Sequence, residues 1–234
     1  SVYNAQLTTP VVKIDSMFFH GRALVDVKPS RGKVKYYYTL DGTEPTAKSN
    51  LYTEPFQIKE TGEFKIKATM EGWMDSKVAT FPLLRLGVKP DRIILETKPD
   101  PKHSGKLDST LVDGKSGGLN RDDKEYLGFI TKDHQVLFQL DEPKKLSQVT
   151  LSILEDVDVW GGADKNNLVR LGRMVSVLPQ GKRPASKKLI KVNFPEQAVR
   201  FVRLKAKNVG TLPAWHLLQK TTKASIFVDE VSLE

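Results

Sequence analysis

The chain contains no cysteine among its 234 residues. This absence removes disulfides, thiol nucleophiles and cysteine-ligated zinc together. Long apolar runs are also missing, since none approaches the roughly 20 residues that a membrane-spanning helix needs. No signal peptide is present and the chain opens at Ser1, so we expect a mature or trimmed piece of a longer precursor without membrane insertion.

Catalytic motifs are missing as well. The sequence has neither the Gly-x-Ser-x-Gly nor the His-Glu-x-x-His pattern of hydrolases, and its four histidines lack the spacing of metal ligands. Gly114-Lys115-Ser116 ends like a phosphate-binding loop, but Ser109 stands where that loop needs a glycine. RNA-binding and zinc-finger signatures are absent too. We therefore predict a protein that is not an enzyme and does not bind nucleic acid.

Positive charge is abundant, with 37 Lys and Arg against 28 Asp and Glu, a net charge of +9. The basic residues are spread along the chain, and over 200–207 they partly alternate with apolar residues, which is typical of the wet face of a strand. A solvated face is the simpler interpretation. The alternative is a contact surface for sulfated or uronic glycans.

Short apolar segments rich in Val, Ile, Tyr, Phe and Thr, bounded by Pro, Gly, Asp and Asn, follow one another along the sequence. Such segments predict β-strands. No stretch has the pattern of a long amphipathic helix, although a short turn near 107–113 or 165–171 is compatible with the sequence. The fold class is therefore predicted as all-β, in sandwiches or barrels. The predicted strands are 10–14, 23–27, 34–40, 62–70, 78–84, 93–97, 136–140, 147–154, 174–178, 188–194, 199–207 and 224–233.

A proline-rich stretch divides the chain in two. Pro90, Pro99, Pro101 and Gly105 lie in it. We predict a first domain over 1–86, then a linker over 87–106 that includes the first strand of the second domain, and a second domain over 107–234.

The first domain carries its clearest motif at 36–46, Tyr-Tyr-Tyr-Thr-Leu-Asp-Gly-Thr-Glu-Pro-Thr. Asp41-Gly42 is a strong turn signal after a strand. With the later Ser-x-x-Tyr-x-x-Pro and Ile-Lys-Ala segments, the order resembles the small immunoglobulin-like β-sandwich at the C-terminus of chitobiase and β-hexosaminidase relatives, which has no known catalytic residues. Tyr36, Tyr37 and Tyr38 either form an aromatic platform for a sugar or alternate between core and solvent, and we favour alternation.

The second domain opens on Leu-Val-Asp-Gly at 111–114, has Gly-Phe at 128–129 and ends on Phe-Val-Asp-Glu-Val at 227–231. These features resemble the discoidin-like (coagulation factor 5/8 type C) module, a galactose-binding-like jelly roll. The resemblance implies a structural calcium ion held by Asp113, Ser116 and Glu230, with oxygen ligands as calcium prefers. The alternative is that Asp113 caps a turn and Glu230 is solvated. Two glycines follow Ser116 where a Thr and a Trp are common in the family.

The same resemblance implies a glycan site on the loops at one end of the second domain. A sugar needs an aromatic face and fixed polar groups. Trp160 is the main aromatic candidate, although it could instead cover the sandwich edge. The predicted carbohydrate-binding residues are Trp160, Tyr126, Arg121, Asn166 and His216.

The two resemblances imply a non-catalytic carbohydrate-binding accessory region of a larger bacterial glycan-degrading or cell-surface protein. We expect it to be secreted, periplasmic or on the cell surface, and monomeric. Its expected partners are a glycan and the catalytic domain of its parent protein. The alternative function is a structural spacer or protein-contact module without a sugar site.

Overall fold

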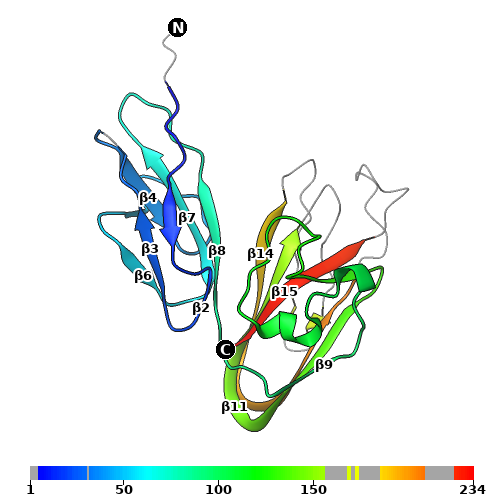
Figure 1. Cartoon of the computed structure of the whole chain (residues 1–234). Coiled ribbons are helices and arrows are strands. Elements are labelled where there is room, and N and C mark those ends of the chain that lie inside the picture. The colour runs from blue at the N-terminus through cyan, green and yellow to red at the C-terminus, as the bar shows by residue number, and fades with distance from the viewer. Residues whose placement is uncertain (1–4, 31, 156–167, 170–171, 174–184, 209–223) are drawn as a thin grey trace. The chain divides into compact units, whose positions relative to one another are not determined.

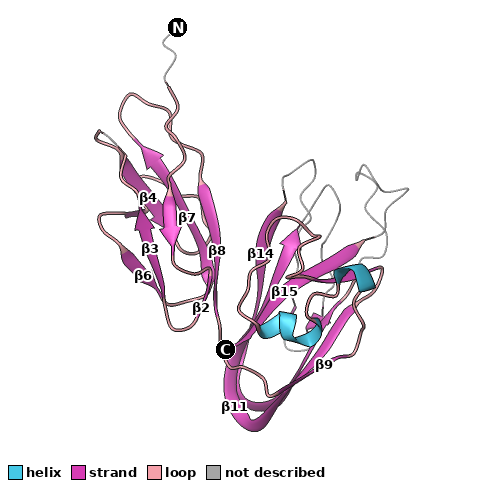
Figure 2. Cartoon of the chain, viewed as in Figure 1, coloured by secondary structure: helices cyan, strands magenta, loops and turns pink. Residues whose placement is uncertain are grey.

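The computed structural model describes residues 5–30, 32–155, 168–169, 172–173, 185–208 and 224–234. The chain divides into two compact units, Ser1–Arg85 and Leu86–Glu234. Both units are built from strands (Figures 1 and 2), and the described helical segments are two short 3-10 turns, η1 (Pro101–His103) and η2 (Leu107–Val112). The predicted all-β class is confirmed. No helix among the described residues is long and apolar enough to cross a membrane.

The first unit contains a three-stranded and a five-stranded sheet. The smaller sheet has the order β1 (Val12–Ile14), β3 (Ala23–Val27) and β6 (Phe56–Ile58). The larger sheet has the order β2 (Phe18–Phe19), β8 (Ala79–Arg85), β7 (Gly62–Thr69), β4 (Lys35–Thr39) and β5 (Asn50–Leu51).

Side chains of alternating polarity give each sheet of the first unit one apolar face. Along β3, Ala23, Val25 and Val27 are buried, and the residues between them are exposed. On β7, Phe64 and Ile66 belong to the same core, and Tyr36 and Tyr38 of β4 also pack into it. Because successive strand residues point to opposite faces, Tyr37 lies on the other face of β4. The predicted alternation of the three tyrosines is confirmed.

The Asp41-Gly42 segment forms the turn that the sequence predicts. The Asp41 carboxylate accepts the backbone N–H of Thr43 at 3.0 Å and its hydroxyl at 2.6 Å. These bonds fix the chain where it leaves β4, so the motif serves the turn that ends the strand.

The second unit is organised around two long strands, β11 (His134–Glu155) and β14 (Ser186–Ala206). They pair along most of their length. β15 (Ser225–Leu233) pairs with the later half of β11, β10 (Leu127–Ile130) pairs with β15, and β9 (Arg92–Leu95) pairs with the earlier half of β11. A small separate pair joins β12 (Leu168–Val169) to β13 (Gly172–Arg173).

The observed bounds of β11 and β14 differ from the predicted strand boundaries. The segments 136–140 and 147–154, predicted as two strands, belong to β11, and 188–194 and 199–207 both fall largely in β14. The pairing shifts register between Gln139 and Lys144 and again between Leu146 and Gln148. Pro143 and Pro195 lie within these irregular stretches, where no ladder hydrogen bond is lost. Both strands curve there, at the lower end of the unit in Figure 1, and so contribute to both layers around the core.

Candidate functional site

The predicted glycan-binding residues of the second unit do not come together among the described residues. Trp160, Asn166 and His216 lie outside the part of the chain that the structure describes. Arg121 is half-buried. Tyr126 is completely buried, so its ring is not on the surface where a sugar could stack.

Tyr126 instead holds a glycine-rich loop inside the second unit. Its hydroxyl donates to the carbonyl of Gly118 at 2.5 Å, and its ring packs edge-on against Phe227 with centroids 6.4 Å apart. A Cβ on Gly117 would lie 2.4 Å from the Tyr126 ring. Only glycine fits there while the Tyr126 ring keeps its place. Burial raises the pKa of Tyr126, so the phenol stays protonated.

A buried ion pair lies beside this loop. The ammonium group of Lys187 contacts the carboxylate of Asp229 on β15, and the N–H of Gly117 donates to the same carboxylate at 2.8 Å. Burial raises the pKa of Asp229 and lowers that of Lys187, and each group opposes the shift of the other. The pair ties the loop to the last strand in the interior of the unit.

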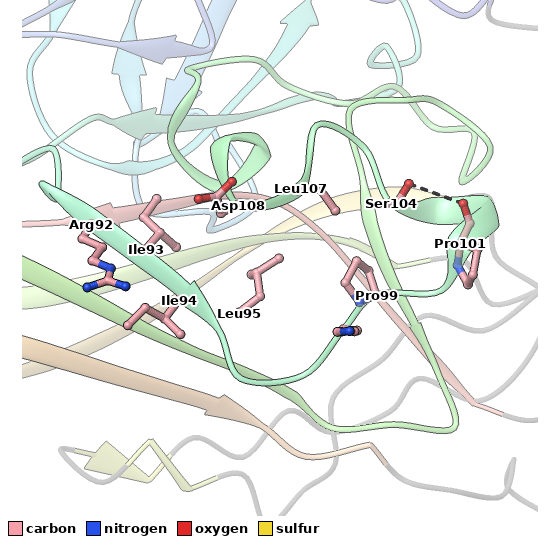
Figure 3. A pocket seen from close by; sticks show the side chains of 10 residues that line it. Arg92, Ile93, Ile94, Leu95, Pro99, Pro101, Ser104, Leu107 and Asp108 are labelled. Carbon is pink, nitrogen blue, oxygen red and sulfur yellow. Dashed lines mark hydrogen bonds between the residues drawn. The ribbon is translucent and has the colours of Figure 1, made fainter.

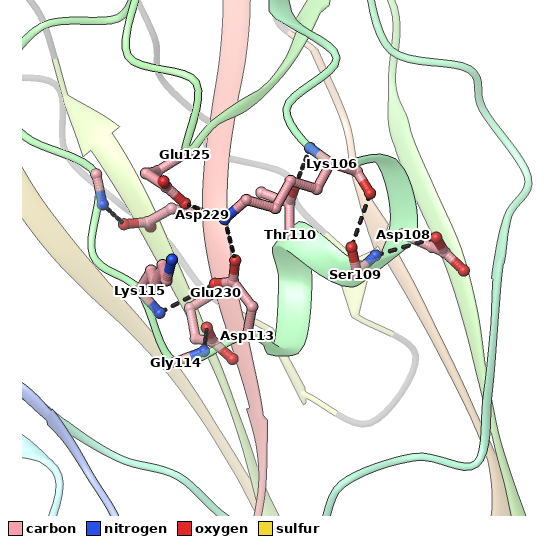
Figure 4. A network of polar contacts seen from close by, with 11 residues as sticks. Lys106, Asp108, Ser109, Thr110, Asp113, Gly114, Lys115, Glu125, Asp229 and Glu230 are labelled. Atoms are coloured by element: carbon pink, nitrogen blue, oxygen red, sulfur yellow. Dashed lines mark hydrogen bonds and ion pairs between the residues drawn. The ribbon is translucent and has the colours of Figure 1, made fainter.

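Asp113 and Glu230, two residues of the predicted calcium site, lie close to each other (Figure 4). The N–H of Gly114, which follows Asp113, donates to the Glu230 carboxylate at 2.8 Å. Lys106 places its ammonium group 2.8 Å from Asp113 Oδ2 and 3.0 Å from Glu125 Oε2. Glu230 is 1% exposed, and burial raises its pKa to about 9.

This arrangement fits calcium poorly. The Asp113 carboxylate is paired with Lys106, and the hydroxyl of Ser116 donates to the carbonyl of Gly117 at 3.2 Å. Within the described ranges, no group of three or more His, Cys, Asp or Glu side chains is arranged to hold a metal ion. Calcium at this loop therefore stays a prediction, and nothing in the proposed function depends on it.

A different cluster in the first unit has the composition of a sugar site. An open groove of about 770 Å³ lies over the outer face of the five-stranded sheet. It combines two aromatic rings with lysines and carboxylates. We call it the Trp73 groove, and its lining residues are Lys33, Lys35, Tyr37, Ala47, Thr69, Met70, Glu71, Trp73 and Asp75.

The turn between β7 and β8 presents Trp73 to this groove. Its side chain is 45% exposed. The N–H of Trp73 donates to the carbonyl of Met70 at 3.1 Å, and Gly72 has a φ of +77°, a left-handed conformation that favours glycine. An ion pair of 2.7 Å between Lys67 and Asp75 anchors the far side of the turn. The tryptophan thus stands exposed on a backbone that is held in place.

The Trp73 groove can recognise a sugar by two kinds of contact. Indole and phenol rings offer apolar faces for the C–H surface of a pyranose. Lysine and carboxylate groups at the rim can bond to hydroxyls. Sequence reasoning missed this site, although the sequence carries a signal for it: Glu71-Gly72-Trp73 puts a tryptophan beside a glycine in a polar turn.

A second hollow, of about 550 Å³, lies in the second unit between β9 and the segment that leads into η2 (Figure 3). Its walls are mainly aliphatic, from Ile93, Ile94, Leu95 and Leu107, and no aromatic side chain belongs to its lining among the described residues. Without a flat aromatic face it suits a sugar less well than the Trp73 groove.

Comparisons with known proteins agree with a β-rich chain but identify no family for the whole of it. The family model described as "Fn3 associated" matches residues 26–83, which include every lining residue of the Trp73 groove. No curated protein matches the chain. The matches name neither a chitobiase-type nor a discoidin-like module, so those assignments stay predictions.

Three solved structures show a distant likeness. A SusE-like protein is 13% identical, with 95% of each chain covered and a TM-score of 0.32. A structure of carbohydrate-binding modules of the β-sandwich superfamily is 8% identical, with 97% of each chain covered and a TM-score of 0.26. A two-domain protein of unknown function from Bacteroides fragilis is 10% identical over 95% of this chain and 93% of that one, with a TM-score of 0.23. TM-scores this low carry no argument about the site.

Proposed function

We propose that this chain is a non-catalytic glycan-binding accessory region and that a sugar binds in the Trp73 groove. The observation that carries the proposal is the exposed ring of Trp73 in one hollow with Tyr37 and with charged side chains. A tryptophan left 45% exposed on an anchored turn keeps a large apolar surface in water, and stacking a pyranose on it would remove that surface from water.

An open groove fits an accessory role. Such a site would bind its glycan weakly and reversibly, and linkage to a catalytic domain would raise the local concentration of that domain's substrate. The proposal therefore includes a larger parent protein that acts on glycans, outside the cell or at its surface.

A glycan array with the wild type and Trp73→Ala tests the proposal. Loss of the ring should weaken binding about tenfold or more, equivalent to about 1.4 kcal/mol, because stacking supplies much of the contact. The thermal stability should hardly change, since the side chain is largely outside the core.

Two further variants make the array decisive. Phe201→Ala removes an equally exposed ring, 54% accessible, from β14 of the second unit and should leave binding unchanged. Trp160→Ala tests the site that the sequence predicts. Loss of binding in Trp160→Ala alone would move the site to the second unit, and no signal on any glycan would favour the spacer function instead.

A further inference from the structure

A row of lysines runs into the Trp73 groove beside the aromatic rings. Lys33, Lys35 and Tyr37 are spaced two residues apart, and Lys35 and Tyr37 belong to β4. Residues two apart on a strand point to the same face, as Lys35 and Tyr37 do, and Lys33, which precedes the strand, lines the groove with them. Tyr37 lies opposite Lys67 of β7, and Lys35 lies opposite Thr69. The outer face of the sheet therefore carries its cations next to the phenol ring.

At this face the positive charges outnumber the carboxylates that are available to pair with them. The Asp75 carboxylate is taken up by the ammonium group of Lys67 at 2.7 Å. Neither Lys33 nor Lys35 has an ion pair from its ammonium group within the described part of the chain. The remaining carboxylate of the lining is Glu71. Two cations thus face one free anion in a hollow that also holds the exposed tryptophan.

We propose that the Trp73 groove selects acidic glycans, in which a carboxylate or sulfate on the sugar contacts Lys33 and Lys35 while the ring stacks on Trp73. This inference rests on the proposed function and adds the chemical class of its ligand. Unpaired ammonium groups are free to accept an anion without first breaking an internal ion pair, and each such contact in an exposed groove adds a modest increment to the affinity.

The test compares sugars that differ only in charge. Oligogalacturonate and its fully methyl-esterified form have the same ring, and one carries a carboxylate where the other carries a neutral ester. We expect the wild type to bind the acid at least about fivefold more tightly than the ester at low salt, and this preference to shrink as salt rises. A sulfated chondroitin oligosaccharide, measured beside its desulfated form, separates preference for sulfate from preference for carboxylate.

Variants connect the preference to the groove. The double variant Lys33→Gln/Lys35→Gln should lose the preference for the acid but keep binding of the ester, whereas Trp73→Ala should lose both. Glu71→Gln should strengthen binding of the acid because it removes the opposing carboxylate. The control Lys13→Gln/Lys59→Gln removes the same charge from exposed lysines outside the groove lining and should behave as the wild type.

The outcomes separate this inference from the proposed function. Equal affinity for acid and ester, with both lost in Trp73→Ala, would overturn the acidic preference and leave the glycan site standing. Salt-sensitive binding that survives both Trp73→Ala and Lys33→Gln/Lys35→Gln would place the site elsewhere and overturn both. Absence of binding to every probe would also overturn both.

Discussion

At the scale of the residue, Glu230 shows how one buried group can dominate the chemistry of a loop. Its carboxyl lies beside the 113–118 segment, where it accepts a hydrogen bond from the N–H of Gly114. Loss of water favours the uncharged carboxyl and outweighs that bond, so the pKa rises from 4.5 to about 9. A glutamate near an acidic loop thus serves as a neutral anchor at physiological pH.

Glu230 makes the stability depend on pH in a defined direction. The folded state holds its proton between about pH 4.5 and 9 while the unfolded state releases it, so this group stabilises the fold fully below 4.5 and loses its contribution as the pH rises to 9. We expect Glu230→Gln to be more stable than the wild type at pH 8, by an amount of the order of a few kcal/mol, and nearly equal to it at pH 5. Thermal melts across this range measure the difference.

The control for this prediction is Glu142→Gln, which changes a carboxylate that is 81% exposed and should leave the melting temperature close to that of the wild type. A wild type that gains stability relative to Glu230→Gln between pH 5 and 9 would contradict the raised pKa.

At the scale of the element, the segment from η1 to β10 is closed by a lysine between two carboxylates. Lys106 reaches Asp113 at the end of η2 and Glu125 before β10. A cation at this point holds together two loops that would otherwise repel each other. Lys106 thus places a positive charge between these two carboxylates.

We predict that removal of Lys106 makes the stability of this segment depend on a bound metal ion. Lys106→Met should lower the melting temperature, and millimolar calcium should restore part of the loss because calcium prefers carboxylate oxygens. Lys102→Met is the matched control, since Lys102 contacts the single carboxylate of Asp122 at 3.1 Å and calcium should not rescue its loss. A chelator that lowers the melting temperature of the wild type would instead support a resident calcium ion.

Elements were predictable where a local pattern decides them. The alternation in β3 and the Asp41-Gly42 turn follow from side-chain period and turn chemistry alone, and both predictions are confirmed. The continuity of β11 through Pro143 was not predictable, because a bulge lets a proline remain inside a strand and depends on pairing with β14. The burial of Tyr126 likewise depends on a partner more than 100 residues away, Phe227.

The Trp73 groove was hidden from the sequence for the same reason. Its rings come from β4 and from the turn after β7, and only the pairing of Lys35 with Thr69 and of Tyr37 with Lys67 places them over one face. The charges depend on tertiary contact as well, since the Lys67–Asp75 ion pair decides which lysines remain free. A strand pattern assigns a side chain to a face but does not show which neighbour shares it.

At the scale of the whole molecule, each unit encloses its own core. Phe64 packs among aromatic rings of the first unit, with Phe81 at 5.9 Å and Phe56 at 6.1 Å between ring centroids. Phe138 is completely buried in the core of the second unit. Because neither described core borrows a side chain from the other unit, each has the apolar surface to fold as a unit of its own.

Because the two cores are independent, we predict that the two units unfold in separate transitions. Phe64→Ala and Phe138→Ala should each cost about 3–5 kcal/mol, but in different units. Calorimetry should show two transitions, with each variant lowering one of them by more than about 10 °C and leaving the other in place. If both variants shift a single common transition, the units unfold together and this prediction is wrong.

Every residue of the Trp73 groove belongs to the first unit. Phe138→Ala should therefore retain glycan binding at a temperature at which its second unit has already melted, whereas Phe64→Ala should lose binding when the first unit melts.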